Sequence, residues 1–120
     1  MSADIATKAQ RLDTQGVARV MSQGRAIQSG SFLLKLLKNS STEPSKVAYV
    51  APKKLFKTAV VRNKAKRTGR ALVTALQRKK PFEKGLSIAF LFRPPIIQRD
   101  FADLLEEMEQ VLTKNGIITV

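Results

Sequence analysis

The sequence predicts an α+β fold: a compact α/β sandwich built on a mixed sheet with a split βαβ unit. Short apolar runs typical of strands alternate with longer segments of helical periodicity. The resulting element order is helix, strands, helix, strand, helix. A length of 120 residues suits a single domain that buries an adequate core without disulfides, and the chain has no cysteine. We therefore expect one domain over residues 1–120.

The first elements are short. Residues 1–12 are polar, and we expect an extended lead-in that is loosely ordered at its start. Thr14 is a candidate N-cap for a short helix that reaches about Gln23, where a glycine follows. Residues 24–30 then form a loop or a short strand.

Three apolar runs predict the main strands. Residues 32–37 and 47–51 are separated by a polar turn, so we expect them to pair as a hairpin. Residues 86–92 form a continuous apolar run, which favours a central strand buried on both faces. Two prolines at 94 and 95 end this strand.

The last predicted element is a helix that begins after Asp100, a candidate cap. Its apolar residues recur at helical spacing: Phe101, Leu104, Leu105, Met108, Val111 and Leu112. The segment also holds five of the 9 acidic residues: Asp100, Asp103, Glu106, Glu107 and Glu109. Acids favour the first turns of a helix, and no other segment offers a partner ligand, so we expect no metal site here.

The most unusual stretch is 52–81. It holds eleven of the 22 Lys and Arg residues and no Asp or Glu. Thr58 can cap a helix over about residues 59–79, and Pro81 closes its far end. At 100° per residue, this helix has two opposite faces. One carries Arg62, Asn63, Lys66, Arg67 and Arg70, and the other carries Val61, Ala65, Gly69, Leu72 and Leu76.

The apolar stripe would face a core, and the cationic face would meet phosphates, with the Asn63 amide able to engage a ribose or base. Charge runs on helices are often only solvated faces. The absence of any acid in this stretch favours nucleic-acid binding, because exposed structural helices usually interleave both signs.

Charge and composition narrow the function further. A net charge of +13 and a pI near 10.7 indicate a polyanionic partner: RNA, DNA or an anionic membrane. No apolar run approaches the roughly 18 residues of a membrane span, and the N-terminus lacks the apolar segment of a signal peptide. We expect a soluble cytoplasmic protein that binds neither membrane nor DNA. The chain also lacks histidine, the commonest general base.

The run Ala-Val-Val-Arg-Asn-Lys-Ala-Lys-Arg at 59–67, followed by Arg70 and preceded by Lys53 and Lys54, resembles the signature of the bacterial ribonuclease P protein. The resemblance implies a small α/β sandwich with an unusual left-handed crossover, where pattern alone would suggest the right-handed form. It also implies a protein subunit that binds a catalytic RNA and the 5′ leader of precursor tRNA. The RNA would hold Mg²⁺ and carry out the hydrolysis that removes the leader.

The resemblance also implies site residues. The contacts to RNA would come from Arg62, Asn63, Lys66, Arg67, Arg70, Lys53, Lys54, Lys57 and Arg11. The leader would lie in a cleft between the sheet and the first helix, lined by Phe32, Leu34, Tyr49, Val17 and Met21. Phe32 and Tyr49 are equally well explained as ordinary core or sheet residues. No residue of the chain is expected to be catalytic.

Three features depart from the family pattern. The turn at 55–58 is one residue longer and lacks glycine, and the first helix has Val17 and Met21 where the family usually presents Phe. Gly69 replaces a bulkier residue on the signature helix; it costs about 1 kcal/mol against Ala and permits close packing.

Two other functions remain open. A ribosomal or general RNA-binding protein shares this charge and size, but would not promote precursor cleavage. A protein-only nuclease would need convergent carboxylates or a histidine.

Overall fold

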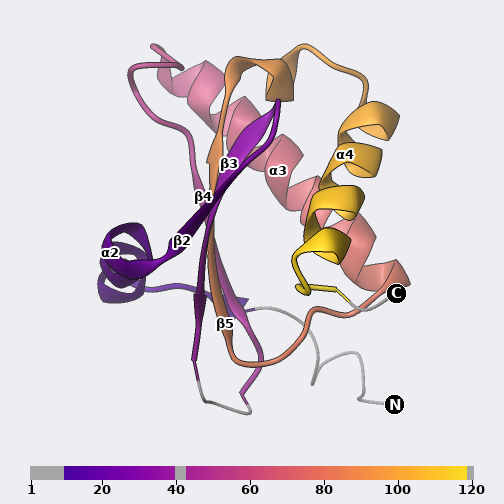
Figure 1. Ribbon diagram of the computed structural model, residues 1–120. Helices are drawn as coiled ribbons and strands as arrows, with labels where there is room; N and C mark the ends of the chain where they lie inside the picture. Colours follow the sequence, from indigo (N-terminus) through magenta and orange to yellow (C-terminus); the bar gives the residue numbers. More distant parts are fainter. Residues whose placement is uncertain (1–9, 40–42, 119–120) are drawn as a thin grey trace.

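The computed structural model describes residues 10–39 and 43–118. They form a mixed five-stranded sheet with helices on both faces (Figure 1). The strands are β1 (Gln10–Arg11), β2 (Arg25–Gln28), β3 (Phe32–Lys38), β4 (Lys46–Val50) and β5 (Leu86–Phe92). The helices are α2 (Thr14–Gln23), α3 (Ala59–Lys79), the 3₁₀ helix η1 (Pro94–Ile97) and α4 (Phe101–Lys114). The predicted α+β class is confirmed.

The strand order is β1-β4-β5-β3-β2, so the predicted hairpin between β3 and β4 is wrong. β5 lies between them, antiparallel to β3 and parallel to β4. Ile88 of β5, for example, is flanked by Leu36 on one side and Val47 on the other. The polar segment after β3 is long enough to span the roughly 10 Å between alternate strands of a sheet. An apolar strand buried on both faces takes the central place, as predicted for residues 86–92.

The parallel neighbours β4 and β5 are joined through α3, which makes a β4-α3-β5 crossover unit. The left-handed form that the resemblance implies stays a prediction. Thr58 caps α3 as expected: the Val61 backbone N–H donates to its hydroxyl over 3.2 Å. The bounds of α3 match the prediction, and its predicted core stripe is buried from Ala65 to Leu76.

The end of the predicted extended lead-in is a short strand. Residues 1–9 lie outside the described part, but Gln10 and Arg11 form β1, a parallel edge strand beside β4. The Gln10 N–H donates to the Ser45 carbonyl (2.8 Å), and Leu12 is buried. The cap of α2 is Asp13, not Thr14, because the Gly16 N–H donates to the Asp13 carboxylate over 2.7 Å.

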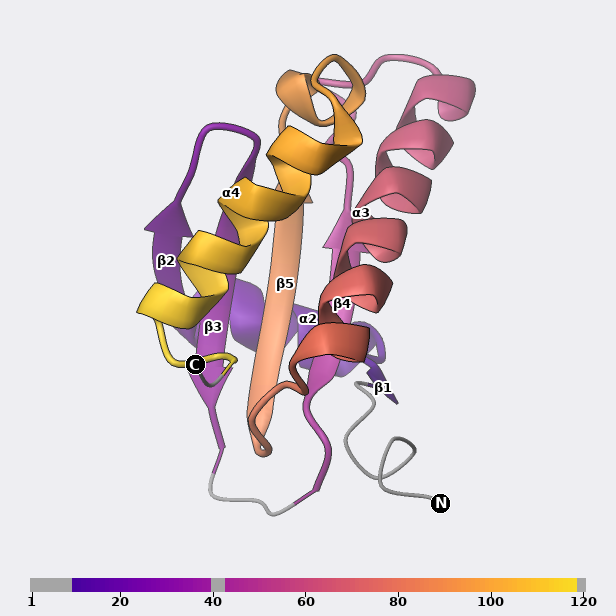
Figure 2. The ribbon, with the colours of Figure 1, turned by 90° about the vertical axis from the view of Figure 1, so that its right-hand side faces the viewer.

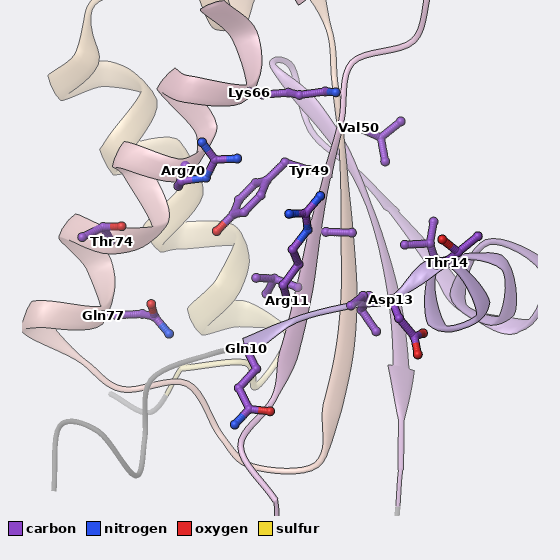
Figure 3. A pocket seen from close by; sticks show the side chains of 14 residues that line it. Gln10, Arg11, Asp13, Thr14, Tyr49, Val50, Lys66, Arg70, Thr74 and Gln77 are labelled. Atoms are coloured by element: carbon purple, nitrogen blue, oxygen red, sulfur yellow. The ribbon is translucent and has the colours of Figure 1, made fainter. Parts of the chain in front are cut away.

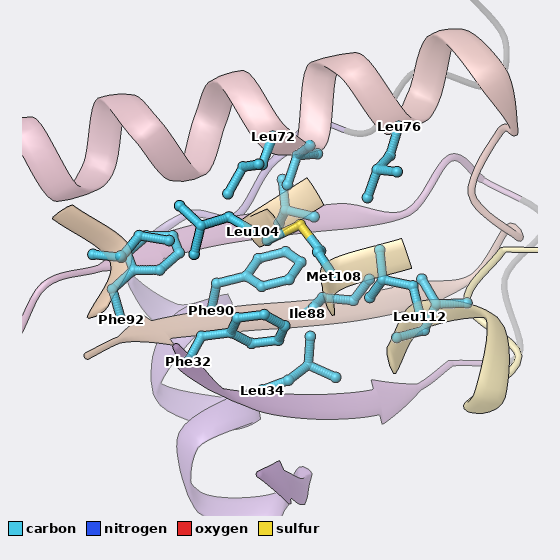
Figure 4. Close-up of a cluster of buried hydrophobic side chains, with 14 of the residues drawn as sticks. Phe32, Leu34, Leu72, Leu76, Ile88, Phe90, Phe92, Leu104, Met108 and Leu112 are labelled. Carbon is cyan, nitrogen blue, oxygen red and sulfur yellow. The ribbon is translucent and has the colours of Figure 1, made fainter. Parts of the chain in front are cut away.

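Two layers of side chains cover the sheet. α3 and α4 lie on one face and α2 on the other (Figure 2). The larger core lies under α3 and α4 and contains Phe90, Phe92 and Met108 (Figure 4). The smaller one joins α2 to the opposite face through Val20 and Ala89.

The start of α4 differs from the prediction at two residues. Phe101 belongs to the predicted apolar series of the helix but is 44% exposed, whereas Leu104, Met108 and Leu112 are buried. Asp100 occupies the cap position, yet its side chain makes no capping hydrogen bond. No helix in the described ranges has the length and apolar content that crossing a membrane requires.

Candidate nucleic-acid interface

A groove of about 630 Å³ runs along the β1 and β4 edge of the sheet. The side chains of α3 form one wall, and the start of α2 forms the other (Figure 3). Three of the predicted RNA-binding cations line it: Arg11 from β1, and Lys66 and Arg70 from successive turns of α3. The groove also contains one carboxylate, that of Asp13, which is bonded to the first turn of α2.

Tyr49 lies on the floor of this groove beneath α3. Its ring stacks on Phe90 with centroids 6.1 Å apart, and the Arg70 guanidinium lies 5.4 Å from the ring centroid, a cation–π contact. Burial raises the pKa of Tyr49 to about 12, although the charge of Arg70 opposes this shift. The hydroxyl therefore stays protonated at neutral pH and can donate a hydrogen bond.

Two polar residues of α3 that line the groove are not among the predicted site residues. Thr74 and Gln77 continue the line of Arg70 along α3 (Figure 3). The side-chain amide nitrogen of Gln77 is buried and has no hydrogen-bond acceptor among the described residues. Both positions fall on the cationic face at 100° per residue, so the same helical projection would have identified them.

The longer turn before α3 is firmly anchored. The N–H groups of Leu55 and Phe56 both donate to the Pro52 carbonyl (3.0 Å each), and the Phe56 side chain is buried. Arg62 closes the turn, because its Nη1 donates to the Phe56 carbonyl over 2.9 Å. Part of the predicted RNA-binding capacity of Arg62 is thus used within the protein. The other predicted contacts outside the groove are exposed: Lys53, Lys54, Lys57, Asn63 and Arg67.

The predicted leader-cleft residues do not share one surface. Phe32 and Leu34 are 1% and 0% exposed in the core under α3 and α4 (Figure 4), so their side chains are not available at the surface for contact with bases. Strand alternation places their side chains on the face opposite α2. Met21 packs in the small core beneath α2 and does not line the groove. Val17 and Tyr49 do line it, from opposite faces of the sheet.

The ion pairs of α3 are confined to its C-terminal end. Lys79 and Lys80 approach the Glu109 carboxylate of α4 at 3.2 and 3.5 Å. Within the described ranges, no cation between Lys53 and Arg70 forms an ion pair. This surface therefore carries a concentrated positive charge, whereas the end of the helix is partly neutralised. The described residues also offer no group of three or more side chains suited to holding a metal ion.

Solved structures share this fold, and they define it as that of the RNase P proteins. The RNase P protein of Staphylococcus aureus superposes with a TM-score of 0.73 at 20% identity, covering 93% of this chain and 100% of that one. The RNase P protein from Thermotoga maritima gives 0.71 at 24% identity, covering 88% and 96%.

Sequence comparison goes further than the fold. Residues 7–116 match the family model described as Ribonuclease P, so the chain belongs to the ribonuclease P protein family. The ribonuclease P protein component of Gluconacetobacter diazotrophicus is 29% identical, with 94% of this chain and 97% of that protein covered. The corresponding protein of Symbiobacterium thermophilum is 30% identical, with 92% and 95% covered. Proteins of this family are components of a ribonucleoprotein nuclease that processes tRNA.

Proposed function

We propose that this chain is the subunit that binds both the catalytic RNA of ribonuclease P and the 5′ leader of precursor tRNA, in the cytoplasm. It promotes magnesium-dependent removal of the leader, and the RNA carries the chemistry. The observation behind this proposal is the cationic surface from Lys53 to Arg70, which adjoins a groove with a tyrosine floor. RNA phosphates can form ion pairs with these cations. Unpaired nucleotides can enter the groove, where side chains donate hydrogen bonds and the Tyr49 ring offers an aromatic surface.

The chain's role is electrostatic. RNA strands that meet near a cleavage site repel each other, and divalent ions or protein cations relieve that repulsion. Mg²⁺ supplies the polarisation and the activated water of hydrolysis when it is bound. In this proposal the catalytic RNA holds the Mg²⁺, and this chain contributes cations and hydrogen-bond donors. Lys66, Arg70 and Arg11 hold phosphates, and Tyr49 and Gln77 can orient a nucleotide beside them.

The test is cleavage of precursor tRNA by the partner RNA at low Mg²⁺, with and without this protein. We expect stimulation by the wild type and at least a tenfold loss with Lys66→Ala/Arg70→Ala, equivalent to about 1.4 kcal/mol. A matched control, Lys38→Ala/Lys84→Ala, removes the same charge at exposed positions outside the groove and should keep the stimulation. Arg62 is left unchanged because it also anchors the turn.

Two results would contradict the proposal. If RNA binding persists without stimulation of cleavage, the chain is a general RNA-binding protein. If the protein alone cleaves precursor tRNA in Mg²⁺, the chain is a nuclease in its own right.

The salt dependence of binding gives an independent prediction. With about five cations on phosphate, the logarithm of the binding constant should fall against the logarithm of salt concentration with a slope near −3.5 to −4.5. Replacing Lys66 by Ala should make that slope shallower by about one. The measurement is a titration of fluorescent RNA at several salt concentrations. A slope near zero would show that the cationic face is merely solvated.

A further inference from the structure

Two large apolar side chains stand exposed within the cationic surface. Val60, in the first turn of α3, is 77% exposed, and Leu55, in the preceding turn, is 46% exposed. Apart from Phe101 on α4, they are the only exposed large hydrophobic residues in the described part of the chain. Lys53, Lys54, Lys57 and Lys64 surround them in sequence, and all four are exposed.

The position of Val60 is not explained by folding. At 100° per residue, it lies about 160° from Arg62, between Arg67 at about 140° and Lys64 at about 200°. The core stripe of α3 occupies the opposite side, with Ala65 fully buried. A β-branched residue also lowers helix propensity slightly. Val60 therefore presents an apolar side chain to solvent and does not contribute to the core that α3 covers.

Leu55, in the turn before α3, is likewise an exposed apolar residue that the core does not need. The next residue, Phe56, points inward and is 1% exposed, so the turn already has its apolar anchor. The backbone of this turn is held by hydrogen bonds to Pro52 and by Arg62. Leu55 is thus presented outward on a fixed backbone rather than on a free loop, which reduces the entropy lost on binding.

We propose that Leu55 and Val60 make an apolar contact with unpaired nucleobases of the partner RNA while the neighbouring lysines hold its phosphates. This inference rests on the proposed function and specifies the part of the RNA that this end of the protein contacts. Unpaired bases expose their faces, whereas paired bases hide them in the stack. The pair of side chains therefore favours a loop, bulge or junction over a regular duplex.

An anionic lipid surface also combines negative charge with apolar groups, but the arrangement of these side chains favours RNA. A helix that lies in a membrane interface needs a broad apolar face. Here two side chains stand on a surface that is otherwise cationic and continues through Asn63 to Arg70 and the groove. Such a surface matches a polymer of phosphates with occasional exposed bases.

The experiment compares Leu55→Ser/Val60→Ser with the wild type in binding to ribonuclease P RNA over a range of salt concentrations. We expect binding about three to ten times weaker at every salt concentration, with an unchanged log–log slope, because no ionic contact is lost. Lys64→Ala should instead make the slope shallower by about one. Phe101→Ser is the control: its exposure is close to that of Leu55, but it stands beside Asp100, and binding should not change. Circular dichroism checks that each variant is folded.

A second arm uses a single-stranded oligonucleotide and an RNA duplex of the same length. The double variant should lose affinity for the single strand and keep its affinity for the duplex. Equal losses on both, no loss on either, or a changed slope would overturn the inference. So would loss of binding to phosphatidylglycerol vesicles with RNA binding intact. Failure of the wild type to stimulate cleavage would instead overturn the proposed function, so the two failures are distinguishable.

Discussion

Replacing Gly69 by alanine is expected to lower the free energy of unfolding by about 1 to 3 kcal/mol, even though alanine is the better helix former by about 1 kcal/mol. A Cβ at this position would lie 2.0 Å from Cζ of Phe92 and 2.7 Å from each Cε. Phe92 is fully buried and stacks near Phe90 and Tyr49, so its ring cannot move aside freely. Urea unfolding followed by circular dichroism measures the change.

A double-mutant cycle shows whether the ring is the cause. Phe92→Leu removes the atoms that the new Cβ would meet, so Gly69→Ala should cost much less in that background than in the wild type. An increase in stability for Gly69→Ala alone would show that the helix and sheet can separate slightly without penalty. Because Phe92 stacks on Tyr49, the substitution should also disturb the floor of the groove and weaken RNA binding.

Replacing Glu107 by alanine is expected to cost about 2 to 3 kcal/mol. Its carboxylate accepts the Ser31 backbone N–H at 2.9 Å and the Ser31 hydroxyl at 2.8 Å, and it is also bonded to the Ser29 hydroxyl and to Arg99. These bonds fasten the link between β2 and β3 to α4. Ser31 is fully buried, so removing its acceptor leaves polar groups without partners. Thermal unfolding would measure the loss; the exposed neighbour in Glu106→Ala is the control and should change little.

The same carboxylate makes stability depend on pH. Burial raises the pKa of Glu107, but the hydrogen bonds from Ser29, Ser31 and Arg99 outweigh it, and the net pKa is lowered. A lowered folded-state pKa gives stability that is present above the unfolded value, about 4.3, and is lost as pH falls through the folded value. The stability gap between wild type and Glu107→Gln should therefore be widest near neutral pH and narrow below about pH 4. A gap that stays constant down to pH 2 would contradict this assignment.

The sequence was most informative where local chemistry decides the structure. Thr58 and Pro81 marked the ends of α3 because capping and the missing proline N–H act on adjacent residues. The continuous apolar run of β5 likewise predicted its central, doubly covered position. The long cationic helix of the candidate site was found by the same local rules.

Features that depend on distant partners were missed or misplaced. Nothing in β3 or β4 alone shows that a strand forty residues further on separates them, so the hairpin prediction failed. Whether the side chains of Phe32 and Tyr49 are buried depends on strand register and on which helix covers each face of the sheet. The groove needs β1, and residues 1–12 have too little apolar pattern to show that two of them pair with β4.

The central position of β5 sets the order in which the molecule can be assembled. β3 and β4 share no backbone hydrogen bonds, so a nascent chain that ends before Leu86 has no continuous sheet. The segments that line the groove are β1, the start of α2, β4 and the cationic face of α3, and all of them are synthesised before the strand that holds them in place. Forming the sheet therefore requires closing long loops, which slows folding relative to a simple hairpin. Until β5 emerges from the ribosome, the cations of α3 belong to a chain with no fixed groove, and RNA met at that stage would be held by charge alone.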